Sequence, residues 1–255
     1  MTQQAPILPL LLQLADTALI LSQRQSAWCG HGPILEQDIA ITNISLDLLG
    51  QARNLYTYAA TILNNGSTED SLAYLRTQRE YQNLCLVELP NGDWAHTILK
   101  LYLYSEYSML YLTALTISKD AQLAAIATKC IKETTYHLRW SKEWVLRLGD
   151  GTTESHNKMI DAIDAVWPTV PELFTMEPYE QHLLLSGVGV NNAALEQYWL
   201  SNVLHTLEQA TLPTHYTIYK GWRGLQGKQG IHTEHLGAIL AEMQHLQRTY
   251  PNCTW

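Results

Sequence analysis

The chain has 255 residues, 46% of them hydrophobic, which predicts a folded globular protein and excludes a disordered one. Only 16% of the residues are charged, the net charge is −8 and no run of Lys or Arg occurs, so nucleic acid is excluded as the main partner. No apolar stretch of about 18 residues occurs either, and we therefore expect no membrane span.

The aromatic residues and the cysteines are used unevenly. Tyr and Trp number 14 and 8 against a single Phe. Such amphipathic rings are common at interfaces, so their excess indicates a protein partner. The four cysteines, Cys29, Cys85, Cys130 and Cys253, lie far apart without a CxxC motif, and neither a zinc site nor a redox dithiol is expected. Scattered thiols are typical of a reducing cytoplasm, where we expect the protein to reside.

Apolar residues recur at helical spacing along the chain, and Gly, Pro and Asn gather between these segments. Helices are predicted over residues 7–25, 41–62, 68–88, 154–167, 190–211 and 233–248. We find no alternating pattern of strands joined by hairpin turns. The sequence therefore predicts an all-α fold.

The span from Asp93 to Leu148 contains neither Gly nor Pro. As a single helix it would run roughly 84 Å, which is too long for a compact domain. Ser118, Lys119 and Asp120 offer cap residues for a second helix, so a break is predicted there. Together the helices predict one domain over residues 1–255, with a four-helix-bundle core and additional helices around it.

Bundles of this kind can hold two iron ions, with Glu-x-x-His on each of two helices and a carboxylate on each of the others. Glu242 and His245 are the only Glu and His with this spacing, and they lie next to the C-terminus. One such pair cannot hold two ions. We interpret it as part of an exposed helical face.

Polar residues also interrupt three of the apolar helices. Asp47 and Gln51 are one turn apart, Glu106 lies in a Tyr-rich helix, and Glu133 precedes His137 by one turn. They are either remnants of a metal site or buried hydrogen-bonded groups that fix the packing. We favour the second interpretation, with Glu106, Glu133 and His137 as structural polar residues.

A Gly-rich stretch between residues 220 and 230 carries Lys220, Arg223 and Lys228. It matches neither a phosphate-binding loop nor a dinucleotide fingerprint. Three cations on a flexible loop of an acidic chain are candidates for contact with a partner or with the phosphates of coenzyme A, and an ordinary exposed connection is the alternative. The same candidate surface includes His232, Glu234 and His235.

Several longer motifs follow in order along nearly the whole chain. They are Leu21–Arg24, Trp28–Pro33, Leu46–Asn54, Pro90–Gly92, Ile131–Arg139, Gly230–Gly237 and Leu240–Gln244. Together these motifs resemble the C subunits of the ring-1,2-phenylacetyl-CoA epoxidases, and Gly230–Gly237 with the residues that follow it is specific. The resemblance implies a ferritin-like fold and a place in a bacterial monooxygenase complex of aerobic phenylacetate degradation.

The resemblance also implies a division of labour within that complex. A sister subunit holds the di-iron centre and binds the CoA thioester, which O₂ converts to a ring epoxide. A reductase supplies electrons from NADPH. The C subunit is structural, so we expect no catalytic residue and no cofactor in this chain. Its expected partners are the catalytic subunit, the other epoxidase subunits and the reductase.

The ligand motifs of the sister subunit can be placed on this chain residue by residue. Its Asp-Glu-x-Gly-His falls on the stretch that starts at Asp47, and its Lys-Glu-Glu-x-Phe-His falls on Lys132 to His137. Only one of the ligating side chains is kept, the imidazole of His137. The six ligand positions become Ala18, Leu48, Gln51, Ser105, Thr134 and His137.

Two further functions remain open from the sequence. The first is an independent metal oxygenase whose site uses other ligands. The second is a helical bundle that binds a small molecule, with coenzyme A held at the loop of residues 220–230. Metal analysis and titration with coenzyme A distinguish both from a structural subunit.

Overall fold

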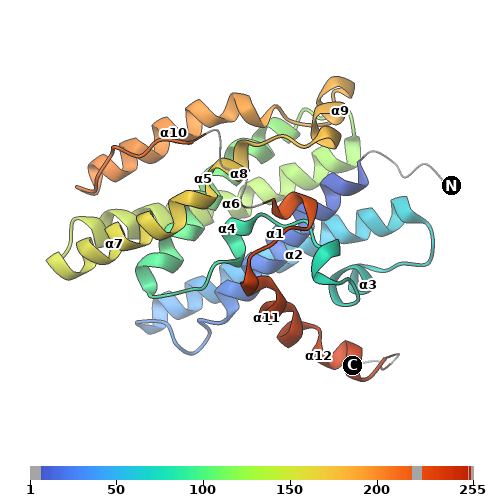
Figure 1. Cartoon of the computed structure of the whole chain (residues 1–255), viewed down its shortest axis with the longest axis horizontal. Helices are drawn as coiled ribbons and strands as arrows, with labels where there is room; N and C mark the ends of the chain where they lie inside the picture. The colour runs from blue at the N-terminus through green and yellow to red at the C-terminus, as the bar shows by residue number, and fades with distance from the viewer. Residues whose placement is uncertain (1–6, 220–225, 252, 254–255) are drawn as a thin grey trace. The chain divides into compact units, whose positions relative to one another are not determined.

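The computed structural model describes residues 7–219, 226–251 and 253 (Figure 1). Within these ranges the chain is helical, and the β-structure consists of an isolated bridge between Gln226 and Ile231. The predicted all-α class is confirmed and is consistent with a ferritin-like bundle. No helix in the described ranges has both the length and the apolar character needed to cross a membrane.

The chain divides into two compact units. Unit 1 comprises residues 1–90 and 225–255, and unit 2 comprises residues 91–224. Each is built on one antiparallel pair of long helices, and a ferritin-like bundle contains two such pairs. The expectation of a single domain over the whole chain stays a prediction.

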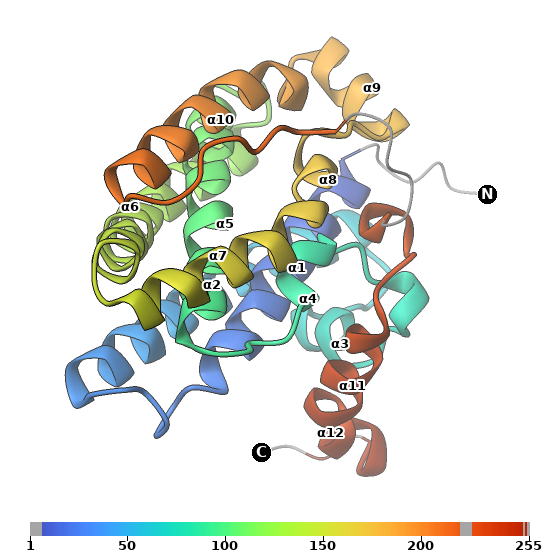
Figure 2. The same cartoon turned by 60° about the vertical axis from the view of Figure 1, so that its left-hand side comes forward.

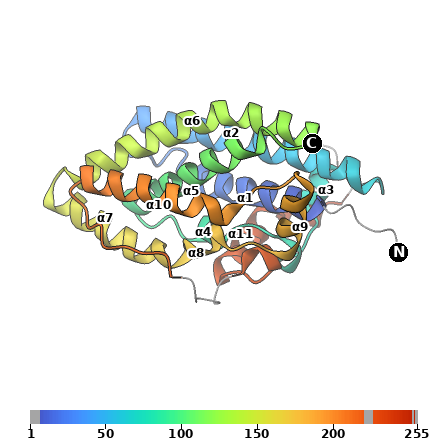
Figure 3. The ribbon, with the colours of Figure 1, turned by 90° about the horizontal axis from the view of Figure 1, so that it is seen from above.

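Unit 1 is centred on α1 (Leu8–Ser26) and α2 (Leu35–Leu63), which lie side by side in Figures 1 and 3. Hydrogen bonds between the two helices, at two places along their length, fix their antiparallel register. The Ser22 hydroxyl donates to the Ser45 carbonyl oxygen at 2.8 Å, and the Tyr56 hydroxyl donates to Asp16 at 2.5 Å. The bounds of α1 lie close to the predicted range, whereas α2 begins six residues before the predicted start at residue 41.

The predicted helix over residues 68–88 is wrong, because the segment folds into three short elements. They are α3 (Glu69–Tyr74), the 3₁₀ turn η1 (Gln78–Glu80) and α4 (Cys85–Glu88). Arg76 ends the first of them, since its guanidinium donates to the carbonyl oxygens of Leu72 at 2.6 Å and Glu80 at 2.9 Å. The Leu72 carbonyl lies in the last turn of α3, where a further helical turn would supply a backbone donor. The Arg76 side chain donates to it instead, so the helix can end there.

The C-terminal part of unit 1 packs on this segment. It contains η3 (Gly227–Gln229), α11 (Glu234–Met243) and α12 (His245–Thr249), with α11 and α12 shown in red in Figure 2. The predicted helix over 233–248 is interrupted at Gln244. Its buried amide nitrogen donates to the carbonyl oxygens of Ala73 at 3.1 Å and Arg76 at 3.0 Å.

Unit 2 is centred on α5 (Trp94–Leu115) and α6 (Ala121–Gly149). The predicted break between them is confirmed, because Asp120 caps α6 by accepting the Leu123 amide at 2.8 Å. The ring of Trp94 packs edge-on against Trp140 and Trp144, with centroid distances of 6.0 and 5.8 Å. These contacts hold the start of α5 against the second half of α6.

The remaining helices of unit 2 surround this pair. They are α7 (Thr153–Val166), the 3₁₀ turn η2 (Trp167–Thr169), α8 (Pro171–Phe174), α9 (Pro178–Ser186) and α10 (Asn192–Gln209). Both α7 and α10 pack on α5 and α6 (Figure 2). Trp199 of α10 is fully buried, and its indole donates to the Leu103 carbonyl oxygen at 3.1 Å. The helices α8 and α9 were not predicted, although each begins at a proline, which is favoured at the first helical position.

Candidate functional site

The ligand positions inferred from the family resemblance fall in both units. In unit 1, Ala18, Leu48 and Gln51 are buried, whereas Asp47 is partly exposed. Ala18 and Leu48 present only hydrocarbon, and an amide such as Gln51 is a weak ligand for iron. The three inferred ligand positions in unit 1 therefore carry neither a carboxylate nor an imidazole.

In unit 2, the corresponding residues Ser105, Thr134 and His137 are all buried. Two neutral hydroxyls and one imidazole do not make the carboxylate-rich donor set that a di-iron centre requires. His137 shares α6 with the half-buried Glu133 one turn earlier, and the pairing of these two side chains stays a prediction. The donor set thus does not fit a di-iron group.

Glu106 has a structural partner within unit 2. Its carboxylate is buried on α5, and Oε1 accepts a hydrogen bond from the Asn202 amide of α10 at 2.6 Å. A buried carboxylate costs several kcal/mol when it has no donor. The bond therefore ties α10 to α5 and satisfies part of that requirement.

A second buried carboxylate, Glu88, lies at the end of α4 in unit 1 and is held by several donors. Its Oε1 accepts from the Asn83 amide at 3.0 Å. Its Oε2 accepts from the backbone amide of Thr233 at 2.9 Å and from the Thr233 hydroxyl at 2.6 Å. The backbone carbonyl of Glu88 accepts from the Arg24 guanidinium at 3.0 and 2.5 Å.

His232 completes this network. Its Nδ1 lies 2.6 Å from Oε1 of Glu88, and its Nε2 lies 2.8 Å from the backbone oxygen of Tyr81. A carbonyl oxygen can only accept, so Nε2 carries a proton. The carboxylate also accepts three other hydrogen bonds, two from Thr233 and one from Asn83. Both side chains are fully buried, and their close contact is the ion pair Glu88–His232.

Cys85 lies beside the same pair, and its sulfur, one Glu88 oxygen and one His232 nitrogen fall within 4.8 Å of one another. Such a trio resembles the ligand set of a transition metal. However, both ring nitrogens of His232 and both oxygens of Glu88 are engaged with protein groups. A bound ion would have to displace the proton shared by the pair, so the contacts fit an ion pair better than a metal centre.

A second buried ion pair in unit 1 joins Asp16 of α1 to Arg76. The guanidinium contacts both carboxylate oxygens, with 3.0 Å between Nη1 and Oδ2, and it stacks over the Tyr81 ring at 4.4 Å. Asp16 also accepts from the Gln82 backbone amide at 2.8 Å. Burial lowers the pKa of Arg76, but Asp16 and Tyr56 outweigh it and raise that pKa above its ordinary value.

Tyr81 connects the two ion pairs, because its ring covers Arg76 and its backbone oxygen accepts from His232. The motif Gly230–Gly237 closes over this segment. Gly230 has φ +75°, and a Cβ there would clash with the Arg79 carbonyl oxygen, so glycine is required on both counts. The most specific motif of the sequence therefore packs the C-terminal residues against the segment from Tyr74 to Glu88.

Comparison with known proteins agrees with the motif pattern. A sequence profile described as phenylacetic acid catabolic protein matches residues 1–255. The chain belongs to this family. Among curated proteins, the C subunit of 1,2-phenylacetyl-CoA epoxidase from Escherichia coli strain K12 is 46% identical over 246 residues, which cover 96% of this chain and 97% of the relative. The resemblance inferred from the motifs is confirmed.

The candidate contact residues of the chain are placed differently from expectation. The side chain of His232 is buried in the ion pair, so it is not a surface contact. Lys228 lies in η3 and is buried, where an exposed cation was predicted. Glu234 is exposed and His235 is half-buried on α11. Lys220 and Arg223 lie outside the described residues.

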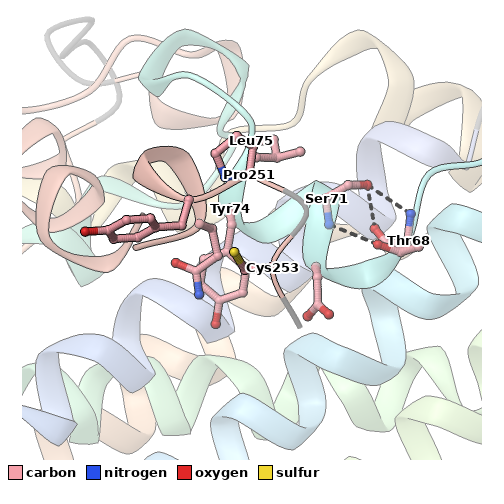
Figure 4. Close-up of a pocket in the computed structure, with 9 residues that line it drawn as sticks. Thr68, Ser71, Tyr74, Leu75, Pro251 and Cys253 are labelled. Carbon is pink, nitrogen blue, oxygen red and sulfur yellow. Dashed lines mark hydrogen bonds between the residues drawn. The ribbon is translucent and has the colours of Figure 1, made fainter. Parts of the chain in front are cut away.

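Unit 1 also contains an open pocket of about 500 Å³ between α3 and the C-terminal residues (Figure 4). Thr68 and Ser71 lie on one side, hydrogen-bonded to each other in the capping box of α3, and Cys253 lies opposite. The charged residue among those that line it is Asp70. The described lining residues include no Lys or Arg, so the pocket offers no cation to a phosphate group and does not support binding of coenzyme A.

Sequence reasoning did not identify Glu88 or Asp16 as site residues. Each is a single acidic residue in an apolar segment, without a partner at helical spacing. The available signal was the glycine at each end of Gly230–Gly237, which indicated a close backbone approach. Its partner segment is far away in the chain and was not identifiable from that motif.

Proposed function

We propose that this chain is the structural, non-catalytic subunit of a multicomponent phenylacetyl-CoA epoxidase, and that it binds and stabilises the di-iron catalytic subunit. The observation that carries the proposal is the hydrocarbon at Ala18 and Leu48, buried positions where the family resemblance expects iron ligands. The similarity to the C subunit of such an epoxidase, over nearly the full length of both chains, supports the place in the complex.

In this proposal the chain contributes binding energy and rigidity, and takes no part in the chemistry. The di-iron centre and the thioester belong to the catalytic subunit, and a reductase supplies electrons. The ion pairs Glu88–His232 and Asp16–Arg76 would keep unit 1 in one conformation for assembly. The complex would reside in the cytoplasm, in keeping with the four free cysteines of the chain.

The test compares this chain, the catalytic subunit and the mixture of both, each with reductase, NADPH and O₂. Consumption of phenylacetyl-CoA and formation of the epoxide are followed by mass spectrometry. We expect no turnover from this chain alone, and faster or longer-lived turnover from the mixture than from the catalytic subunit alone. Turnover by this chain without the catalytic subunit would instead establish an independent oxygenase, and failure of the two subunits to associate would overturn the structural role.

Titration of the isolated chain with coenzyme A separates the structural role from small-molecule binding. We expect no saturable heat signal, because Lys228 is buried and the described residues that line the pocket beside α3 include no cation. Stoichiometric binding at micromolar concentration would favour the small-molecule function.

A further inference from the structure

Three oxidisable rings follow one another through unit 2. Trp199 of α10 lies 5.8 Å from Trp167 of η2, and Trp167 lies 5.0 Å from Tyr216, measured between ring centroids. Trp199 is fully buried, Trp167 is 8% exposed and Tyr216 is half-buried. The rings therefore lead stepwise from the core of unit 2 to the solvent. We refer to these three residues as the aromatic row.

The composition of the chain sets the aromatic row apart from ordinary ring packing. Phe fills a core without needing a hydrogen-bond partner, yet the chain has one Phe against 14 Tyr and 8 Trp. That residue, Phe174, lies 5.4 Å from Trp199 on the inner side of the row. Indole and phenol rings lose an electron far more readily than a phenyl ring, so the oxidisable series starts at Trp199. An interface with a partner does not account for Trp199 and Trp167, because both are buried.

The hydrogen bonds of the two indoles leave an electron vacancy free to move on. Nε1 of Trp199 donates to the Leu103 carbonyl oxygen at 3.1 Å, and Nε1 of Trp167 donates to the Thr217 carbonyl oxygen at 2.9 Å. A backbone carbonyl accepts a hydrogen bond but is too weak a base to take the proton. An oxidised indole in either place therefore stays a radical cation until a neighbouring ring supplies an electron.

Tyr216 has a proton acceptor of a different kind. Its hydroxyl donates at 2.8 Å to Oδ1 of Asp164, an exposed residue of α7. Burial and this carboxylate raise the pKa of Tyr216, so its ring is a neutral phenol at pH 7. The imidazole of His215 stacks on the same ring at 4.7 Å. A phenol releases its proton when it is oxidised, and Asp164 is placed to take it.

We propose that the aromatic row conducts oxidising equivalents out of the core of unit 2 to Tyr216, where Asp164 accepts the proton and the radical comes to rest. This inference rests on the proposed function, since a subunit of an oxygen-activating complex meets radicals derived from O₂. Such radicals are the one-electron oxidants that the row would discharge. The activity is protective, because it moves the damage from a buried indole to a replaceable site at the surface.

Each step transfers one electron. Trp199 gives an electron to the oxidant and becomes a radical cation, and Trp167 then reduces Trp199 and becomes the radical cation in its place. Tyr216 gives one electron to Trp167 and its hydroxyl proton to Asp164, which leaves a neutral indole, a neutral tyrosyl radical and a carboxylic acid. A thiol in solution returns a hydrogen atom to Tyr216 and becomes a thiyl radical, and Asp164 loses its proton to water.

The test generates the oxidant in solution and needs no partner subunit. The full-length chain is illuminated with tris(bipyridine)ruthenium and a cobalt(III) quencher, and the spin trap DMPO marks the protein radicals, which peptide mapping by mass spectrometry locates. We expect the trap mainly on Tyr216, although Tyr198 is 68% exposed and Tyr216 is half-buried. Labelling that follows exposure, with more trap on Tyr198 than on Tyr216, overturns the proposal.

Asp164→Asn removes the proton acceptor and keeps the size of the side chain. We expect a several-fold loss of trap on Tyr216, a rise in oxidised Trp167 and Trp199, and an unchanged melting temperature, because Asp164 is exposed. Asp161→Asn is the matched control, since Asp161 is exposed on the same helix and lies outside the row. If both variants label Tyr216 equally, Asp164 does not take the proton and the proposal is wrong.

Trp167→Phe interrupts the aromatic row and keeps a ring in its place. Oxidised Trp199 should then accumulate several-fold, because Trp167 no longer supplies the electron, and labelling of Tyr216 should fall. Equal oxidation of Trp199 in the variant and the unmodified chain would show that Trp167 carries no electron. Trp167 is buried, so a thermal melt checks the fold of this variant, and Asp164→Asn decides if it does not fold.

The outcomes also separate this inference from the proposed function. If the chain does not associate with a catalytic subunit, the proposed function fails, while the labelling of the isolated chain is unaffected. If the chain associates and its labelling follows exposure alone, only the aromatic row fails as a path for oxidising equivalents.

Discussion

Glu88 and His232 form a buried ion pair, with 2.6 Å between Oε1 and Nδ1, although 144 positions separate them in the sequence. The pair fixes the residues before α11 to the end of α4. Because each side chain is shielded from water, neither charge is stable without the other. The contact therefore makes the C-terminal segment part of the folded core of unit 1.

Replacing His232 should destabilise the protein strongly. His232→Ala leaves the Glu88 carboxylate buried without its cation, which costs about 3–5 kcal/mol of unfolding free energy. His235→Ala is the matched control, because His235 is half-buried on the next helix and should change the free energy by less than about 0.5 kcal/mol. Urea denaturation followed by circular dichroism measures both. Equal midpoints for His232→Ala and the unmodified chain would refute the ion pair.

Arg76 should not be replaceable by lysine. Its guanidinium contacts two oxygens of Asp16 and also donates to the carbonyls of Leu72 and Glu80, and one ammonium group cannot reproduce this planar set. We expect Arg76→Lys to lower the unfolding free energy by about 2 kcal/mol or more, as expected when buried groups lose hydrogen bonds.

Arg79→Lys provides the control for that experiment, because Arg79 is exposed three positions later. Its thermal melt should coincide with that of the unmodified chain. If Arg76→Lys melts at the same temperature as Arg79→Lys, the hydrogen bonds of the Arg76 guanidinium do not stabilise the fold.

The two breaks in the helical pattern show what the sequence can predict. The break at Asp120 was predictable, because an aspartate that caps the amide three residues later is a local signal. The break at Arg76 was not, because it depends on Asp16, 60 positions earlier. Within residues 68–88 the local preference is helical, and a distant carboxylate outweighs it.

The same distinction applies to the candidate site. Leu48 and Thr134 lie at ligand positions that the resemblance implies, and that neither side chain is a good iron ligand follows from the residue types without coordinates. The role of His232 was predicted wrongly, since a histidine next to a basic loop looks exposed until Glu88 is found beside it. Burial of Lys228 was missed for a related reason, because glycine neighbours suggested a flexible loop.

The four thiols should differ in reactivity. Cys29 and Cys253 are exposed, whereas burial, with a smaller effect from Glu133, raises the pKa of the Cys130 thiol to about 12. At pH 8 only about one in ten thousand Cys130 side chains is then the reactive thiolate. Iodoacetamide should modify Cys29 and Cys253 within minutes and Cys130 only after denaturation.

Peptide mapping by mass spectrometry measures the modification at each cysteine. Labelling in guanidinium chloride is the control, and all four thiols should then react at similar rates. Native labelling of Cys130 as fast as Cys29 would contradict its burial on α6.

A variant of His137 tests whether this residue stabilises the helix packing or takes part in the iron chemistry of the complex. His137 is the one inferred ligand position with a ligating side chain, and it is buried on α6. If it fixes the packing, His137→Ala lowers the unfolding free energy by about 1–3 kcal/mol through loss of a buried polar group. The iron content of the assembled epoxidase and its turnover per iron should stay unchanged, because the proposed function places the iron in the catalytic subunit. Elemental analysis of the complex and a thermal melt of the variant measure the two effects. A loss of iron or turnover without a loss of stability would make His137 a functional residue and contradict the structural role.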